Sequence, residues 1–125
     1  MLKILAHDNA LMQFCPLEKM FALMAHEDTK YPFVVFSRNQ LSVQYTKDMK
    51  GQYGHDNTVQ LTIDCHGNTY EMSIELANLL RNALEGKGWR DDDIQVDTFR
   101  LVSAYETTDG QTDFQQTLIF ETMVE

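Results

Sequence analysis

The residues of this chain that are best suited to chemistry form a short run, Asp64-Cys65-His66, whose carboxylate, thiolate and imidazole are all metal ligands. The run ends a stretch, residues 57–66, in which apolar and polar side chains alternate as they do along a β-strand. Neighbouring side chains on a strand point to opposite faces, so Cys65 cannot join Asp64 and His66 around one ion without distortion. We therefore predict a structural role for this run and no metal site.

A second pair, His55-Asp56, has the residue types of a general base and its partner. It follows Gly54 in a hydrophilic stretch without a serine or cysteine nucleophile motif nearby, so we interpret it as part of a solvated loop. His7 and His26 are isolated and receive the same interpretation. The sequence also lacks a nucleophile elbow, a metal-ligand cluster and a glycine-rich phosphate loop. We expect a protein that is not an enzyme and that needs no cofactor.

The charge balance excludes tight binding of nucleic acid. The chain has 10 Lys and Arg against 19 Asp and Glu, which gives a formal net charge of −9. Proteins that hold DNA or RNA need a basic surface, because contacts from Lys and Arg to phosphates dominate that affinity. An acidic surface can still lie beside DNA that has to slide past it, because repulsion then prevents sticking.

Length and cysteine usage indicate one intracellular domain. A chain of 125 residues is large enough to bury a core, and we predict a single domain over residues 1–125. No apolar run is long enough to span a bilayer, and the N-terminal MLKILA lacks the features of a signal peptide, so we expect no membrane association. Cys15 and Cys65 lie in different predicted elements, and we expect both to be reduced core residues.

The first part of the chain predicts short helices and then a strand. Residues 2–14 have the spacing of one or two helical turns, and Asp8 or Asn9 can cap the second. Residues 19–25 are short and uniformly apolar, which fits a helix or a strand, and we predict a strand. Three methionines of this region could form an adaptable binding surface, but core packing is the favoured interpretation. They are Met12, Met20 and Met24.

Two strands separated by a long connection follow. Pro32 disfavours a helix, so residues 33–45 are predicted to be a strand, and residues 57–66 form the next one. Residues 46–56 between them are hydrophilic and too numerous for a tight hairpin turn. They nevertheless include Met49 and Tyr53, which is more apolar surface than a passive connection needs.

The segment 69–85 predicts one amphipathic helix. Asn68 can cap it, with Glu71 completing a capping box, and Gly86 supplies the stop. Its apolar residues fall on one stripe, which we expect to pack against the apolar face of strand 57–66. The stripe consists of Met72, Leu76, Leu79, Leu80, Ala83 and Leu84.

Two further strands complete the predicted domain. Residues 94–105 are extended in composition, but their apolar phase slips between Val96 and Phe99, which indicates a bulge or break. Residues 114–124 alternate well, and an Asp-Gly pair before them predicts a hairpin. The expected fold is α+β: a mainly antiparallel sheet of four or five strands, with the long helix on one face and a short N-terminal helical segment.

One helical residue is out of place. Ile74 falls on the polar side of the helix near Tyr70 and Arg81, a composition typical of a subunit contact. An exposed isoleucine of no consequence is an equally good interpretation. The position alone does not distinguish the two.

The order of these elements resembles the tail terminator, or tail completion, proteins of long-tailed bacteriophages and related prophages. The resemblance covers most of the chain and is one of hydrophobicity and spacing. The segments that carry it, after the short N-terminal helix and around the long connection, are K-M-F-A-L-M-A, Y-P-F-V-V-F, V-Q-L-T-I-D, S-I-E-L-A-N-L-L-R-N-A-L-E-G and F-Q-Q-T-L-I-F-E-T.

The resemblance implies a structural function. Such proteins form a ring, usually a hexamer, that caps the tail tube and offers a docking surface to the head connector. The implied partners are therefore further copies of the chain, the tail tube protein and the head connector protein, with DNA passing through the ring. The implied locations are the bacterial host cytoplasm during assembly and the virion tail.

A cyclic ring of this kind needs two different contact patches on each subunit. The family's long connection reaches toward neighbours or the lumen, and we assign the first patch to its counterpart here, with Met49 and Tyr53 as anchors. The residues of this patch are Lys47, Met49, Lys50, Gln52, Tyr53 and His55. The second patch is left to the polar strand face at Thr62 and Asp64 or to the helix edge at Ile74.

Two other classes of function compete with this one. A small ligand-binding or regulatory α+β domain would need convergent polar groups in a cavity between sheet and helix. A hydrolase would need one of the motifs that the sequence lacks. Neighbouring genes for capsid, connector and tail-tube proteins would favour the structural hypothesis, whereas metabolic neighbours would contradict it.

Overall fold

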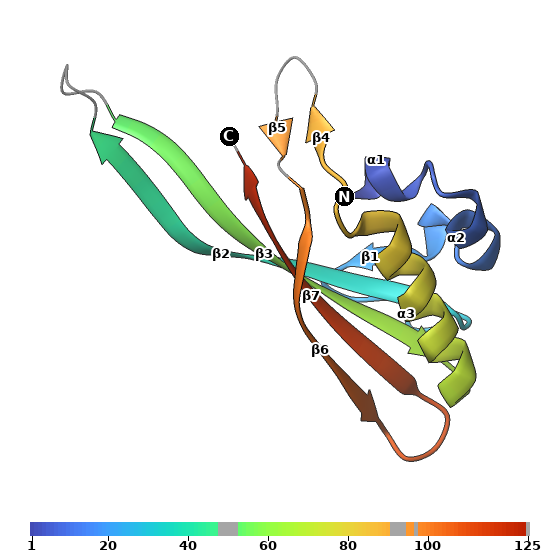
Figure 1. The fold of residues 1–125 in the computed structure, drawn as a ribbon. Coiled ribbons are helices and arrows are strands. Elements are labelled where there is room, and N and C mark those ends of the chain that lie inside the picture. Colours follow the sequence, from blue (N-terminus) through green and yellow to red (C-terminus); the bar gives the residue numbers. More distant parts are fainter. Residues whose placement is uncertain (48–52, 91–94, 97, 125) are drawn as a thin grey trace.

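A computed structural model of the chain describes residues 1–47, 53–90, 95–96 and 98–124. Short helices come first, then two long strands, the long helix, and a final set of strands (Figure 1). In chain order the elements are α1 (Leu2–Leu5), α2 (Asn9–Phe14), a 3-10 turn (Leu17–Lys19), β1 (Met20–Ala22), β2 (Phe33–Lys47), β3 (Tyr53–Gly67), α3 (Tyr70–Leu84), β4 (Trp89–Arg90), β5 (Gln95–Val96), β6 (Arg100–Thr108) and β7 (Phe114–Val124).

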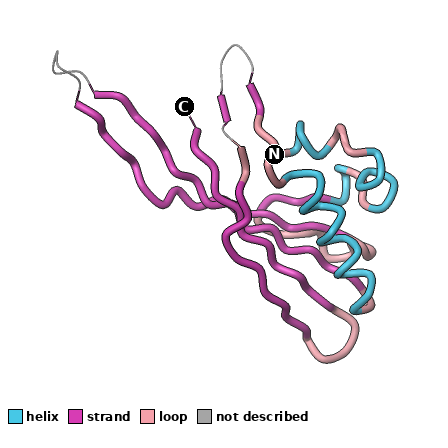
Figure 2. Tube along the Cα trace, in the orientation of Figure 1, coloured by secondary structure: helices cyan, strands magenta, loops and turns pink. Residues whose placement is uncertain are grey.

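The strands form one sheet with the helices on one side of it (Figure 2). Its body has the order β1-β2-β3-β7-β6, and the two-residue strands β5 and β4 continue it beside the end of β7. All neighbours pair antiparallel except β1 and β2, which are parallel. The predicted α+β fold, with five main strands, one long helix and a short N-terminal helical segment, is confirmed.

The expected loop over residues 46–56 is wrong for most of its length. β2 continues to Lys47 and β3 begins at Tyr53, and these two residues pair with each other. The outer ends of β2 and β3, which finish at Lys47 and begin at Tyr53, project from the rest of the molecule as a long hairpin (Figure 1). We call this hairpin the arm. Outside the core a strand needs no apolar face, so the hydrophilic composition that indicated a loop is compatible with a solvated two-stranded ribbon.

The N-cap of helix α3 lies one residue later than predicted. The Met72 N–H donates to Thr69 Oγ1 at 3.1 Å, so Thr69 and not Asn68 is the N-cap. Gly67 lets the end of β3 pass close to this first turn, since a Cβ there would lie 2.6 Å from the backbone nitrogen of Ser73. After the helix, Gly86 adopts φ +76°, as expected for a glycine stop.

The core lies between α3 and the sheet. Leu76, Leu80 and Leu84 are fully buried against apolar residues of β3 and β7, including Ile63 and Phe120. Burial of such side chains contributes roughly 1.5–3 kcal/mol each. The predicted packing of the helix stripe against the strand is confirmed, although Leu79 and Met72 are only partly buried.

The N-terminal helices close one end of this core. Leu5 and Leu11 are fully buried, and Asp8 caps α2 by accepting the Leu11 N–H at 2.9 Å. Cys15 and Cys65 are free and buried, as predicted, and burial raises the pKa of both thiols, to about 11 for Cys15.

The prediction for the methionines is partly wrong. Met20 is buried and Met12 packs on the core, but Met24 is 80% exposed. It follows β1 in a segment that leaves the sheet.

The last strands confirm the predicted break and hairpin. β5 ends at Val96, and β6 starts after an isolated bridge between Phe99 and Glu85; Ile94 lies outside the described residues. The hairpin between β6 and β7 turns at Asp109, whose carboxylate accepts three backbone N–H bonds, and at Gly110, which has φ +83°.

Candidate interaction surfaces

The Asp64-Cys65-His66 run has the geometry predicted for it. Cys65 is buried on the face toward α3, whereas Asp64 and His66 lie on the opposite face. The Asp64 carboxylate accepts the Thr117 hydroxyl at 2.8 Å, and His66 Nδ1 lies 2.9 Å from the Asp113 carboxylate. Within the described part of the chain, no three His, Cys, Asp or Glu residues gather as a metal site would require.

The second predicted pair, His55-Asp56, is not in a loop. Both residues lie in β3 within the arm, where His55 pairs with Tyr45 and Asp56 with Gln44. Lys47 and Tyr53 also belong to the arm, as its last mutually paired residues. Met49, Lys50 and Gln52 lie outside the described residues. The described residues of the predicted first patch therefore lie on the paired strands of the arm.

The sheet face turned away from α3 is polar and hydrogen-bonded within itself. Thr62 and Asp64 are half-buried on β3, opposite Ile119 and Thr117 of β7. Gln115 Nε2 donates to Thr117 Oγ1 at 3.1 Å, and the Thr117 hydroxyl donates to Asp64. At the end of this face, the His66 ring stacks on Phe33 at 4.5 Å. Such a face offers hydrogen-bonded oxygens and short side chains to a partner.

The two lateral edges of the sheet are open. β6 has nine residues, and all of them except Leu101 are exposed, among them Val102 and Tyr105. On the other side, β1 pairs with β2 only from Val34 to Phe36. Beyond Phe36, the described part of β2 pairs with β3 alone. Unpaired backbone groups along an edge strand are a template for pairing with another chain.

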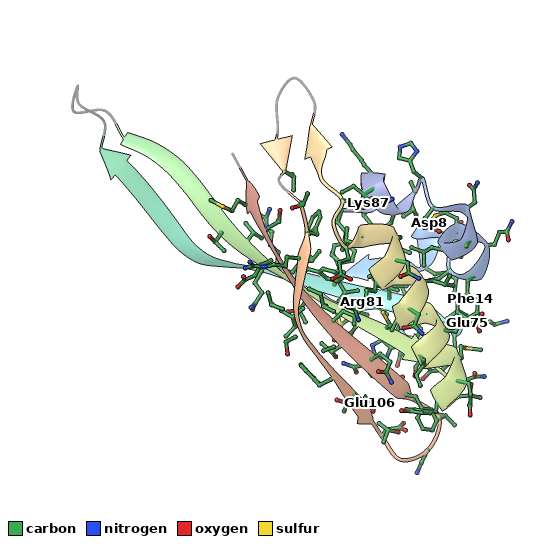
Figure 3. The ribbon with its side chains drawn as sticks, viewed as in Figure 1. Asp8, Phe14, Glu75, Arg81, Lys87 and Glu106 are labelled. Atoms are coloured by element: carbon green, nitrogen blue, oxygen red, sulfur yellow. The ribbon has the colours of Figure 1, made fainter. Side chains whose placement is uncertain are left out.

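A hollow of about 310 Å³ lies at the β6 edge, where α3 begins. The Tyr70 and Phe114 rings meet edge to face at 6.4 Å, and Gln116 Nε2 donates to the Glu106 carboxylate at 2.8 Å. Figure 3 labels Glu106 on β6. Hydrogen bonds from Gln116 and Tyr70 lower the pKa of Glu106, so this carboxylate is ionised at neutral pH. The hollow is lined by Tyr70, Glu106, Thr107, Thr108, Phe114 and Gln116.

Ile74 is half-buried on α3, one turn after Tyr70. A more exposed apolar pair was missed by sequence reasoning. Leu23 and Met24, directly after β1, are 78% and 80% exposed. The available signal was that the apolar run continues past the strand into a polar loop, but periodicity could not show where the strand ends.

Comparisons with known proteins identify the fold. No family model matches the chain, and no curated protein matches it. Among solved structures, a chain of the "Virion of native gene transfer agent (GTA) particle" superposes with a TM-score of 0.74 over 98% of this chain and 90% of that chain, at 14% sequence identity. At this identity the similarity shows a shared fold. No helix in the described ranges is long and apolar enough to cross a membrane.

Proposed function

We propose that this protein is a structural component of a phage-like virion, and specifically a tail terminator or completion protein that caps the tail tube as a ring. The observation that carries the proposal is the fold: a chain from a gene transfer agent virion matches over nearly the whole length of both molecules. The order of elements in the sequence independently resembles tail terminators. Both lines of support concern particle assembly.

The open sheet edges support assembly from several copies. β6 at one edge and the uncovered part of β2 at the other are different surfaces on opposite sides of one sheet. A head-to-tail contact between different surfaces generates a closed ring when the rotation between copies closes. The resemblance to tail terminators implies a hexameric ring. It also implies the tail tube protein and the head connector protein as further partners.

The arm is the second element that fits this role. It extends beyond the core that α3 covers (Figure 1) and holds Lys47, Tyr53 and His55 on its two strands. An arm that projects from the rest of the molecule can reach a neighbouring subunit or the tube. The polar face around Thr62 and Asp64 and the helix edge at Ile74 remain the candidate surfaces for the other contact.

The charge of the chain suits a ring around DNA. A net charge of −9 repels phosphates, so DNA can pass without being held. The proposed locations are the bacterial host cytoplasm during assembly and then the virion tail.

Shortening the arm tests this function. Replacing residues 45–55 by Asn-Gly, between the paired residues Gln44 and Asp56, gives a tight hairpin in place of the outer part of the arm. When the genome that encodes the particle carries this change, we expect tails of irregular length that fail to join to heads. Electron microscopy of the particles measures both effects. The matched control is Gln111→Ala in the β6–β7 turn, which leaves the arm unchanged. Tails of normal length with the short arm would contradict the assigned role.

A further inference from the structure

The apolar pair Leu23-Met24, which we call the knob, is held on the surface by a strained turn. These two side chains have the highest exposed fractions among the large apolar residues that the structure describes. Leu23 adopts φ +69°, a backbone conformation that is unfavourable for residues that carry a Cβ. Its N–H donates to the Phe36 carbonyl at 2.8 Å, and the Met24 N–H donates to the Ala22 carbonyl at 2.8 Å, which closes a γ-turn around Leu23.

Strain and exposure of this kind need a reason. A leucine and a methionine exposed side by side gain no hydrophobic stabilisation, and the turn adds a backbone cost. Strained residues concentrate where a particular presentation of side chains is useful. The knob therefore has the properties of a contact that is completed by another molecule.

The hollow at Tyr70 and Phe114 lies at the opposite edge of the sheet from the knob. The knob follows β1, at one end of the strand order, whereas the hollow is lined by the end of β6, at the other end. Its two aromatic rings offer apolar surface, and aromatic residues are enriched at subunit interfaces. One protruding and one concave patch at opposite edges are the two different surfaces that a head-to-tail contact requires.

Strand direction brings these patches together when the open edges of two copies meet. β2 and β7 run one way and β3 and β6 the other, so β2 of one copy meets β6 of the next antiparallel. Pairing along β2 can start only at Ser37, where β1 stops covering it, which is beside Leu23. When β6 pairs along its whole length with this uncovered part of β2, the antiparallel partner of Ser37 is the carboxyl end of β6, where Thr107 and Thr108 line the hollow.

The charges at this junction are also complementary. Arg38 is exposed on β2, directly after Ser37. Glu106 is exposed on β6, two residues before the strand ends, and is ionised. In the antiparallel arrangement these two opposite charges lie close to each other at the rim of the contact. Such charges guide the approach of the two surfaces and fix their register.

We propose that the knob of one copy inserts into the hollow of the next copy, so that the occupant of the hollow is a second molecule of this chain. This contact rests on the proposed ring and names the residues that join its subunits. The contact repeats around the ring, since every copy carries one knob and one hollow.

Cysteine cross-linking tests the contact. In the double variant Met24→Cys/Thr108→Cys, an oxidant should form a disulfide between the thiol introduced in the knob of one copy and the thiol introduced in the hollow of the next, and so produce a ladder of covalent oligomers. Thr108 pairs with Phe114 and lines the hollow. The native Cys15 and Cys65 are buried and give little background. The matched control is Lys87→Cys/Thr108→Cys, because Lys87 is exposed after the carboxyl end of α3, whereas the hollow lies where α3 begins. Trapping also captures transient encounters, so the test applies to a chain that is monomeric when dilute.

A second variant separates the contact from folding. Adding Leu23→Gly to the cross-linking pair removes the side chain and suits the positive φ, so the melting temperature should stay the same or rise. The rate of cross-linking should fall at least about ten-fold, which corresponds to losing the burial of one leucine side chain. Cross-linking no faster than in the control, an equal rate with Met24→Cys alone, or no effect of Leu23→Gly would each overturn the proposal.

These outcomes are distinguishable from failure of the proposed function. A wild-type ring seen by native mass spectrometry, without a cross-link between positions 24 and 108 in the double variant, would refute this contact alone. A specific ladder through these two positions from a protein that is absent from virions would leave the contact standing and refute the tail function.

Discussion

Leu80 and Leu79 are adjacent on α3, but the fold depends on them to different degrees. Leu80 is fully buried, whereas Leu79 is only partly buried. Leu80→Asp places an unpaired carboxylate in the core, and we expect it to lower the free energy of unfolding by on the order of 4 kcal/mol. Leu79→Asp should cost clearly less. Urea unfolding measures both, with the exposed Asn78→Asp as control; equal, small effects would show that the stripe is not buried.

The two thiols provide a second test at this scale. Burial raises the pKa of Cys15 to about 11 and that of Cys65 as well, so both are protonated at pH 8, and the thiolate is the reactive form. We expect neither thiol to react with a thiol reagent in the native protein at pH 8. Both should react quickly in denaturant. Stoichiometric labelling of native protein within minutes would contradict the assigned packing of β3 and the segment after α2.

The structural roles of some single residues could be predicted from the sequence, and those of others could not. The alternation around Cys65 separated it correctly from Asp64 and His66, because a strand with one buried face leaves no other register. The cap of α3 was misassigned to Asn68 because both Asn68 and Thr69 are good caps, and only the direction of the chain leaving β3 decides between them. The positive φ of Leu23 could not be predicted, since leucine does not favour it.

At the scale of elements, periodicity succeeded where one face meets the core. β7 has the predicted bounds, Phe114–Val124, and α3 was predicted to within one residue at each end, because both separate apolar from polar sides. Residues 46–56 were predicted to be a loop because they are hydrophilic. The described ones among them extend β2 and β3 into the arm, and pairing between two strands outside the core does not require an apolar face.

The arm is therefore expected to be separable from the core. Replacing residues 45–55 by Asn-Gly removes the part of the arm beyond the Gln44–Asp56 pair and leaves the rest of β2 and β3 in place. We expect the midpoint of thermal unfolding to change by no more than about 4 °C, the shift that roughly 1 kcal/mol produces in a domain of this size. Circular dichroism during heating measures it. A loss of cooperative unfolding would show that the arm contributes to the core and would remove its assignment as an assembly element.

For the whole molecule, we propose that this acidic α+β protein forms a ring at the end of a virion tail. The order of the predicted elements suggested this function, because elements that face the core have a readable pattern. The contact surfaces could not be predicted from the sequence, because sheet edges and hollows depend on which strands are neighbours. The open edges, the projecting arm and the fold shared with a virion chain are all consistent with assembly.

The ring proposal can be tested by imaging virions that carry an electron-dense tag on this chain. The tag follows the C-terminal strand β7 (Figure 1). We predict density for several copies arranged as one ring at the head-proximal end of the tail tube. Density that is spread along the whole tube, located in the capsid or absent from particles would contradict the proposed ring.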